Sequence, residues 1–80
     1  MIPPAPDSVI VELRAYYKVL SIDNVYLDER GGRWRILCFL KGNKLVRQSL
    51  DTGICSIQSC WTFAEKLTYI GKYNANKRTD

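Results

Sequence analysis

Apolar runs separated by short glycine-bearing breaks occupy the middle of the chain, a pattern typical of antiparallel β-strands. Residues 31–50 begin with a glycine pair, continue in an apolar run headed by Arg33 and Trp34, and turn at Gly42-Asn43 into a second run rich in branched residues. Two runs separated by a short Gly/Asn element predict a β-hairpin. Residues 25–29 predict a third strand, joined to the hairpin through the glycine pair, because glycine readily adopts the positive φ angles of tight turns.

Matching apolar with apolar and acidic with basic positions predicts the register of these strands. A two-residue turn at 31–32 pairs Leu27 with Ile36 on the core face. A three-residue turn at 42–44, together with a bulge, keeps the apolar positions of the next strand on that face. The same register places Arg35 between two acidic residues, one on each neighbouring strand: Asp28 and Asp51.

Residues 9–20 fit two different periodicities. One face of a helix would collect Ile10, Leu13, Tyr17 and Leu20, whereas every second residue from 11 to 19 alternates as in a strand. Asp7-Ser8 can cap a helix N-terminus, and the length of the segment also favours a helix. The run of β-branched residues at 9–11 favours a strand. We predict a short N-terminal helix, with a strand as the alternative.

The C-terminal third predicts three short elements within one domain. Residues 54–58 are expected to form a strand, residues 59–67 a helical turn, and residues 68–73 a final strand. Eighty residues allow a single domain, which we expect at 8–73. Residues 1–7 predict a flexible proline-rich lead, and residues 74–80 predict a flexible polar tail.

Three segments of the chain together resemble small Src-homology-type barrels. They are Val25-Tyr26-x-Asp28-x-Arg30-Gly31-x-x-Trp34, the strand around Val46, and Phe63-x-x-Lys66-Leu67. The resemblance is to short accessory proteins of bacteria and their phages, and it covers about two-thirds of the chain. It implies a protein encoded by a phage or another mobile element. The family hosts nucleic-acid binders, protein adaptors and a few enzymes, so it fixes no single function.

A second resemblance is to the DNA-binding domains of phage integrases, through Gly32-x-Trp34-Arg35 and Leu50-Asp51-Thr52. In those domains a helix follows the three-stranded sheet almost directly, whereas residues 54–57 intervene here. The fold class predicted overall is mainly β, with α+β as the alternative. We expect a small Src-homology-type barrel or a strongly bent antiparallel sheet of four to five strands, with a short N-terminal helix and a helical turn near 59–67.

Positive charge is concentrated in the central hairpin. The chain has 12 basic and 8 acidic residues, giving a net charge of +4, and residues 31–50 contain five basic residues and no acidic one. Basic side chains interleaved with aromatic rings suit phosphate contacts and base stacking, although basic turns also serve solubility and discourage strand aggregation. The candidate nucleic-acid-binding residues are Arg30, Arg33, Lys41, Lys44 and Arg47.

An apolar patch on the predicted outer face suggests a second class of function. The predicted register gathers Tyr26, Leu37 and Phe39 there, and such a cluster usually has a cover. The cover is either the segment 9–20 of the same chain or another protein, including a second copy in a homodimer. The alternative to nucleic-acid binding is therefore a protein-interaction or inhibitor module that uses these three residues.

The sequence offers little for catalysis or for metal binding. It has no histidine, and the motifs of serine hydrolases, zinc peptidases and nucleotide-binding loops are missing. Its three cysteines, at 38, 55 and 60, form no Cys-x-x-Cys pair, although a bond between 55 and 60 is conceivable. No apolar run reaches the roughly 20 residues of a membrane span. We expect a cytoplasmic, non-enzymatic binding module with no cofactor, metal or small-molecule substrate.

Overall fold

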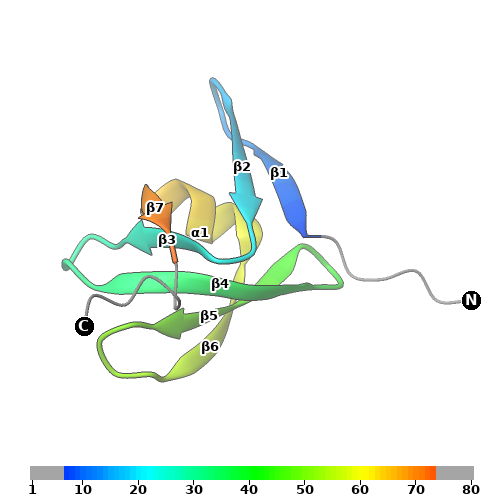
Figure 1. Cartoon of the computed structure of the whole chain (residues 1–80). Helices are drawn as coiled ribbons and strands as arrows, with labels where there is room; N and C mark the ends of the chain where they lie inside the picture. Colours follow the sequence, from blue (N-terminus) through cyan, green and yellow to red (C-terminus); the bar gives the residue numbers. More distant parts are fainter. Residues whose placement is uncertain (1–6, 74–80) are drawn as a thin grey trace, which may run out of the picture.

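The computed structural model describes residues 7–73, which fold into seven strands and one short helix (Figure 1). The predictions for residues 1–6 and 74–80 lie outside this range. The elements are β1 (Ser8–Glu12), β2 (Tyr17–Ser21), β3 (Asn24–Leu27), β4 (Arg33–Leu40), β5 (Lys44–Ser49), β6 (Cys55–Ser59), α1 (Cys60–Lys66) and β7 (Thr68–Lys72).

The strands form two antiparallel sheets. β1 and β2 make a two-stranded hairpin, and the other five strands form a sheet in the order β6-β5-β4-β3-β7. The mainly β fold is confirmed, but the larger sheet stays open, because β6 and β7 are its edges among the described residues. Within residues 7–73, no helix is long and apolar enough to cross a membrane.

The predicted N-terminal helix is wrong, because residues 8–21 form the β1–β2 hairpin. The Leu13 amide donates to the Tyr16 carbonyl at 2.8 Å and closes the turn, while the Ile22 amide donates to the Asp7 carbonyl at 2.9 Å at the open end. The carbonyl of Asp7 thus joins the sheet ladder instead of starting a helix. Branched residues at 9–11 favour this outcome, since their side chains suit a pleated surface better than a helix.

One core joins the hairpin, the five-stranded sheet and α1. Tyr26 lies at its centre, with its ring edge-on to Phe63 at 4.9 Å and to Tyr69 at 5.6 Å between centroids. Of the two covers predicted for Tyr26, Leu37 and Phe39, the one by the same chain is found, so these residues do not form an open interface. Tyr26 and Phe39 are only 1% and 4% exposed, and Leu37 is half-buried, since the hairpin and α1 cover this side of the sheet within the same chain.

The order β3-β4-β5 is as predicted, but both registers differ. Leu27 pairs with Arg33 instead of Ile36, because the β3–β4 loop spans residues 28–32 and is held by side-chain hydrogen bonds. The β4–β5 turn has three residues, at 41–43 instead of 42–44. A bulge is present at Leu37, between Ile36 and Cys38, and it restores Phe39 to the core face.

The C-terminal elements follow the prediction closely. β6, α1 and β7 lie at the expected positions, and α1 buries Phe63 and Ala64 while Leu67 closes its end. All three cysteines are free thiols, so the conceivable 55–60 bond is not formed. Cys60 is buried, Cys38 is half-buried and Cys55 is exposed.

Candidate functional site

The five basic residues predicted to bind nucleic acid do not share one surface. Arg30 and Arg33 lie at the start of β4, and the guanidinium of Arg47 reaches the same end of the sheet. Lys41 and Lys44 lie at the β4–β5 turn, at the other end of β4. Along β4, Arg33 and Lys41 lie eight residues apart, roughly 25 Å at about 3.3 Å per residue. Arg47 is only three residues from Lys44 on β5, but its guanidinium turns toward Trp34.

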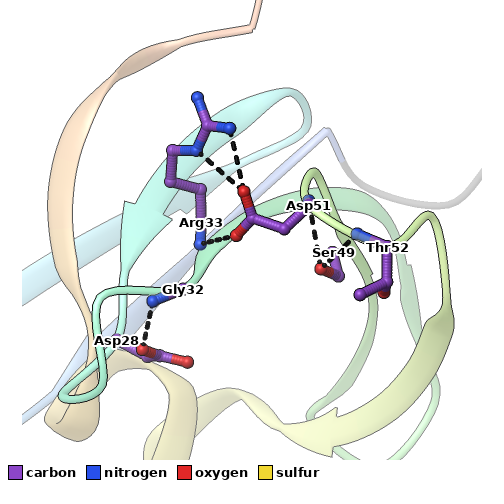
Figure 2. A network of polar contacts seen from close by, with 6 residues as sticks. All are labelled: Asp28, Gly32, Arg33, Ser49, Asp51 and Thr52. Carbon is purple, nitrogen blue, oxygen red and sulfur yellow. Dashed lines mark hydrogen bonds and ion pairs between the residues drawn. The ribbon is translucent and has the colours of Figure 1, made fainter.

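The β3–β4 loop is organised around the carboxylate of Asp28 (Figure 2). Its Oδ1 accepts hydrogen bonds from the amides of Gly32 at 2.7 Å and Arg30 at 2.9 Å, and its Oδ2 accepts one from Trp34 Nε1 at 2.9 Å. The carboxylate packs so closely that a Cβ at position 32 would lie 2.8 Å from Oδ2, which explains the glycine there. The hydrogen bonds from Trp34, Gly32 and Arg30 lower the pKa of Asp28.

This lowered pKa predicts a specific loss of stability in acid. Because the folded state prefers the ionised Asp28, its contribution is complete above the unfolded-state pKa of about 3.9 and disappears as the pH falls through the lower folded-state value. Urea unfolding between pH 6 and pH 2 should therefore show a shallower acid decline for Asp28→Asn than for the wild type. Equal declines in the two proteins would contradict this role of Asp28.

Arg33 forms an ion pair with Asp51 of the β5–β6 loop (Figure 2). Its Nη2 lies 2.9 Å from Asp51 Oδ1, and its backbone amide donates to Asp51 Oδ2 at 3.1 Å. The hydrogen bonds from Arg33 lower the pKa of Asp51. Ser49 Oγ accepts from the amides of Asp51 and Thr52 at 3.2 and 3.1 Å, so the β5–β6 turn presents the Asp51 carboxylate to Arg33 in a fixed position.

Arg47 is stacked on an aromatic ring. Its guanidinium carbon lies 3.9 Å from the centroid of the Trp34 ring, and its Nε donates to Ser56 Oγ at 3.0 Å. Partial burial lowers the pKa of Arg47, and the nearby Asp28 carboxylate opposes that shift. Trp34 thus contacts a cation with its face and a carboxylate with its edge, so Arg47 serves the packing of this end of the sheet.

The acidic partners cancel the positive charge at this end. Arg33 is paired with Asp51, and the Asp28 carboxylate interacts with the charges of Arg30 and Arg47. Glu29 adds a further acidic residue to the same loop. Arg35 does not lie between Asp28 and Asp51 as predicted. It lies 3.7 Å from Asp23, donates to Gln48 at 3.0 Å and stacks on Tyr73 at 4.1 Å. Arg33 and Arg35 are thus each paired with an acidic residue.

The outer face of the β1–β2 hairpin carries an exposed apolar surface. Its residues belong to the segment that was predicted to form a helix. Ile10 pairs with Val19, and Tyr17 precedes Val19 by two residues on the same face. Their exposed fractions are 67%, 54% and 68%, which is high for a contiguous apolar group in so small a domain. Ile10, Tyr17 and Val19 are hereafter called the hairpin patch.

Two grooves flank the hairpin and meet at Trp61, which is 48% exposed. The first has a volume of about 170 Å³ and runs along β1, between residues 9–12 on one side and Asn43, Cys60 and Trp61 on the other. The second, of about 380 Å³, lies between the β1–β2 turn and α1, with Arg14 and Glu65 at its walls. Trp61 thus faces the grooves, whereas Ala64 and Leu67 are buried in the core.

Comparison with protein-family models, with curated proteins and with solved structures gives no match. Within residues 7–73, no three side chains of the metal-binding types come together to hold an ion. Exposed apolar side chains also lie near the sheet edges, at Ile54, Ile57, Tyr69 and Ile70. The hairpin patch is the one that adjoins the two grooves described above, and we take it with them as the candidate site.

Proposed function

We propose that this protein is a non-enzymatic protein-binding module, and that it binds through the hairpin patch and the groove along β1. The observation that carries the proposal is the contiguous exposure of Ile10, Tyr17 and Val19 beside a groove that ends at Trp61. Aromatic and branched side chains on a rigid strand pair bury apolar area at little cost in side-chain entropy. An open strand edge next to them can add backbone hydrogen bonds.

Nucleic-acid binding through the central hairpin has weaker support. Arg33 and Arg47 are held by Asp51 and Trp34. A nucleic-acid-binding surface needs several unpaired basic side chains arranged along the path of the phosphate backbone. Of the predicted set, Arg30, Lys41 and Lys44 are exposed with no ion pair or ring stacking among residues 7–73. Arg30 precedes β4 and the two lysines follow it, so these three charges form no continuous track.

A random-peptide display selection tests the proposal. Peptides should be enriched on the wild-type protein, and their binding should fall at least ten-fold on the double variant Tyr17→Ser, Val19→Thr. Because both side chains are largely exposed, this variant should keep its fold. The matched control, Lys41→Ala with Lys44→Ala, should bind the same peptides as the wild type.

Titration with single-stranded and duplex oligonucleotides supplies the opposing result. We expect only the weak, salt-sensitive binding of a cationic protein, in the range of about 10⁻⁴ to 10⁻⁶ M. Much tighter oligonucleotide binding that is lost in the lysine double variant, with no peptide enriched, would favour nucleic-acid binding and overturn the proposal.

A further inference from the structure

The strand β1 has a free edge with a defined hydrogen-bonding pattern. The backbone bonds of Leu13 with Tyr16 and of Ile22 with Asp7 fix which pairs of the hairpin exchange hydrogen bonds. Bonded and non-bonded pairs alternate in an antiparallel ladder. The N–H and C=O groups of Ser8, Ile10 and Glu12 therefore point away from β2, and β1 has no other partner strand among residues 7–73.

This edge is complementary to itself. When two copies of β1 run antiparallel about a two-fold axis at Ile10, every outward backbone group meets an outward group of the other copy. Ile10 then faces Ile10, Val9 faces Val11, and Ser8 faces Glu12. Apolar side chains meet apolar ones, and the single charge of the strand, Glu12, meets a hydroxyl instead of another carboxylate.

We propose that the partner bound by β1 is a second copy of this chain, joined edge to edge in a four-stranded sheet of order β2-β1-β1-β2. The inference rests on the proposed protein-binding function and names its partner. A two-fold axis makes the contact isologous and closed, so it ends at a dimer. The two hairpin patches become one continuous apolar face across the new sheet, with Ile10 of each copy at its centre.

A groove runs along β1 beside this edge. It is lined by residues 9–12 and by Cys60 and Trp61 at the start of α1, so a strand entering there would cover exposed surface of Trp61. The edge strand β7 is less suited to pairing, since it is irregular: the β3–β7 register shifts at Val25/Tyr26, and Gly71 has a φ of 141°. The edge strand β6 directs the backbone of Ile57 outward and serves as the control.

Sedimentation velocity over a wide range of protein concentration tests the dimer. The wild type should show a monomer–dimer equilibrium, and Ile10→Pro should raise the dimer Kd at least ten-fold, because it removes an outward N–H without touching a bond to β2. Ile57→Pro, which removes the equivalent outward N–H of β6, should leave the Kd unchanged. A wild type that stays monomeric up to millimolar concentration would overturn the inference, as would a dimer weakened by Ile57→Pro and not by Ile10→Pro.

A cysteine variant tests the register independently of how well the proline variants fold. In a background with Cys38→Ser and Cys55→Ser, Ile10→Cys should form an interchain disulfide under mild oxidation, since two copies of residue 10 face each other. Ser8→Cys in the same background should not, because residue 8 faces residue 12 of the other copy. A disulfide that forms in the Ser8→Cys variant and not in the Ile10→Cys variant would contradict the register. A strictly monomeric protein that still selects peptides through the hairpin patch would overturn the dimer and leave the proposed function standing.

Discussion

Replacing Phe63 with alanine will lower the free energy of unfolding by about 3–5 kcal/mol. Phe63 is fully buried, and it packs edge-on against Tyr26 where α1 meets the sheet. The cavity left by the ring borders both the helix and the sheet, so a collapse of one side cannot fill it without moving the other. An 80-residue domain has about 4–12 kcal/mol of stability in total, so the loss should be severe.

Urea unfolding followed by tryptophan fluorescence measures this loss, and Trp61→Ala is the matched control on the same helix. Because Trp61 is half-exposed, its removal should change the free energy of unfolding by no more than about 1 kcal/mol. Circular dichroism follows unfolding in the control, which lacks one of the two tryptophans. A Phe63→Ala protein as stable as Trp61→Ala would mean that the core is not centred on this contact.

Replacing Lys18 with methionine will cost about 1.5–3 kcal/mol, the range for hydrogen bonds made by a charged group. Lys18 lies on the inner face of the hairpin, and its Nζ donates to the carbonyls of Ala64 at 2.7 Å and Leu67 at 3.0 Å. These carbonyls belong to the end of α1, where peptide dipoles favour a cation. The side chain therefore fastens the hairpin to the helix and satisfies two carbonyl groups there.

The same unfolding measurement on Lys72→Met provides the comparison, since Lys72 is exposed on β7 and should change stability by less than about 0.5 kcal/mol. In Lys18→Met we also expect faster amide exchange along β1 and β2, because the hairpin loses its attachment. Identical stability of the two variants would show that the Lys18 hydrogen bonds add nothing to folding.

The sequence predicted the elements that local patterns specify. The strands and helix between residues 54 and 73 were placed closely, because their apolar positions, lengths and turn residues agree. The prediction of a two-residue turn at 31–32 was wrong because Asp28 accepts hydrogen bonds from the amides of its own loop and from the indole of Trp34. Pairing rules compare side chains across strands and do not detect a carboxylate that lengthens the loop.

The hairpin was missed because residues 9–20 satisfy the helical and the strand period equally well. In the strand alternative, Val11 and Leu13 point inward and Ile10 points outward. The same alternation would turn Tyr17 and Val19 inward, and only the turn at 14–15 brings them to the face of Ile10. The helical choice instead buried Ile10 and Tyr17. The side-chain period thus decides which residues of one segment are core and which are surface.

The free positive charge of the predicted nucleic-acid-binding residues was overestimated for a different reason. Local charge density gave residues 31–50 a large positive charge, but Asp51, 18 residues from Arg33 in sequence, folds back onto it. Only the three-dimensional structure brings such partners together. Likewise, the patch of Tyr26 and Phe39 disappeared because the fold covers that face of the sheet with its own hairpin and helix.

Amide hydrogen exchange, resolved by residue with NMR at low and at high protein concentration, tests the central claim most directly. The amides of Val9 and Val11 bond to β2 and should be protected at both concentrations. The amides of Ser8, Ile10 and Glu12 should exchange fast in dilute solution and slow markedly as the concentration rises. An Ile10 amide that exchanges equally fast at both concentrations would contradict the edge-to-edge partner of β1.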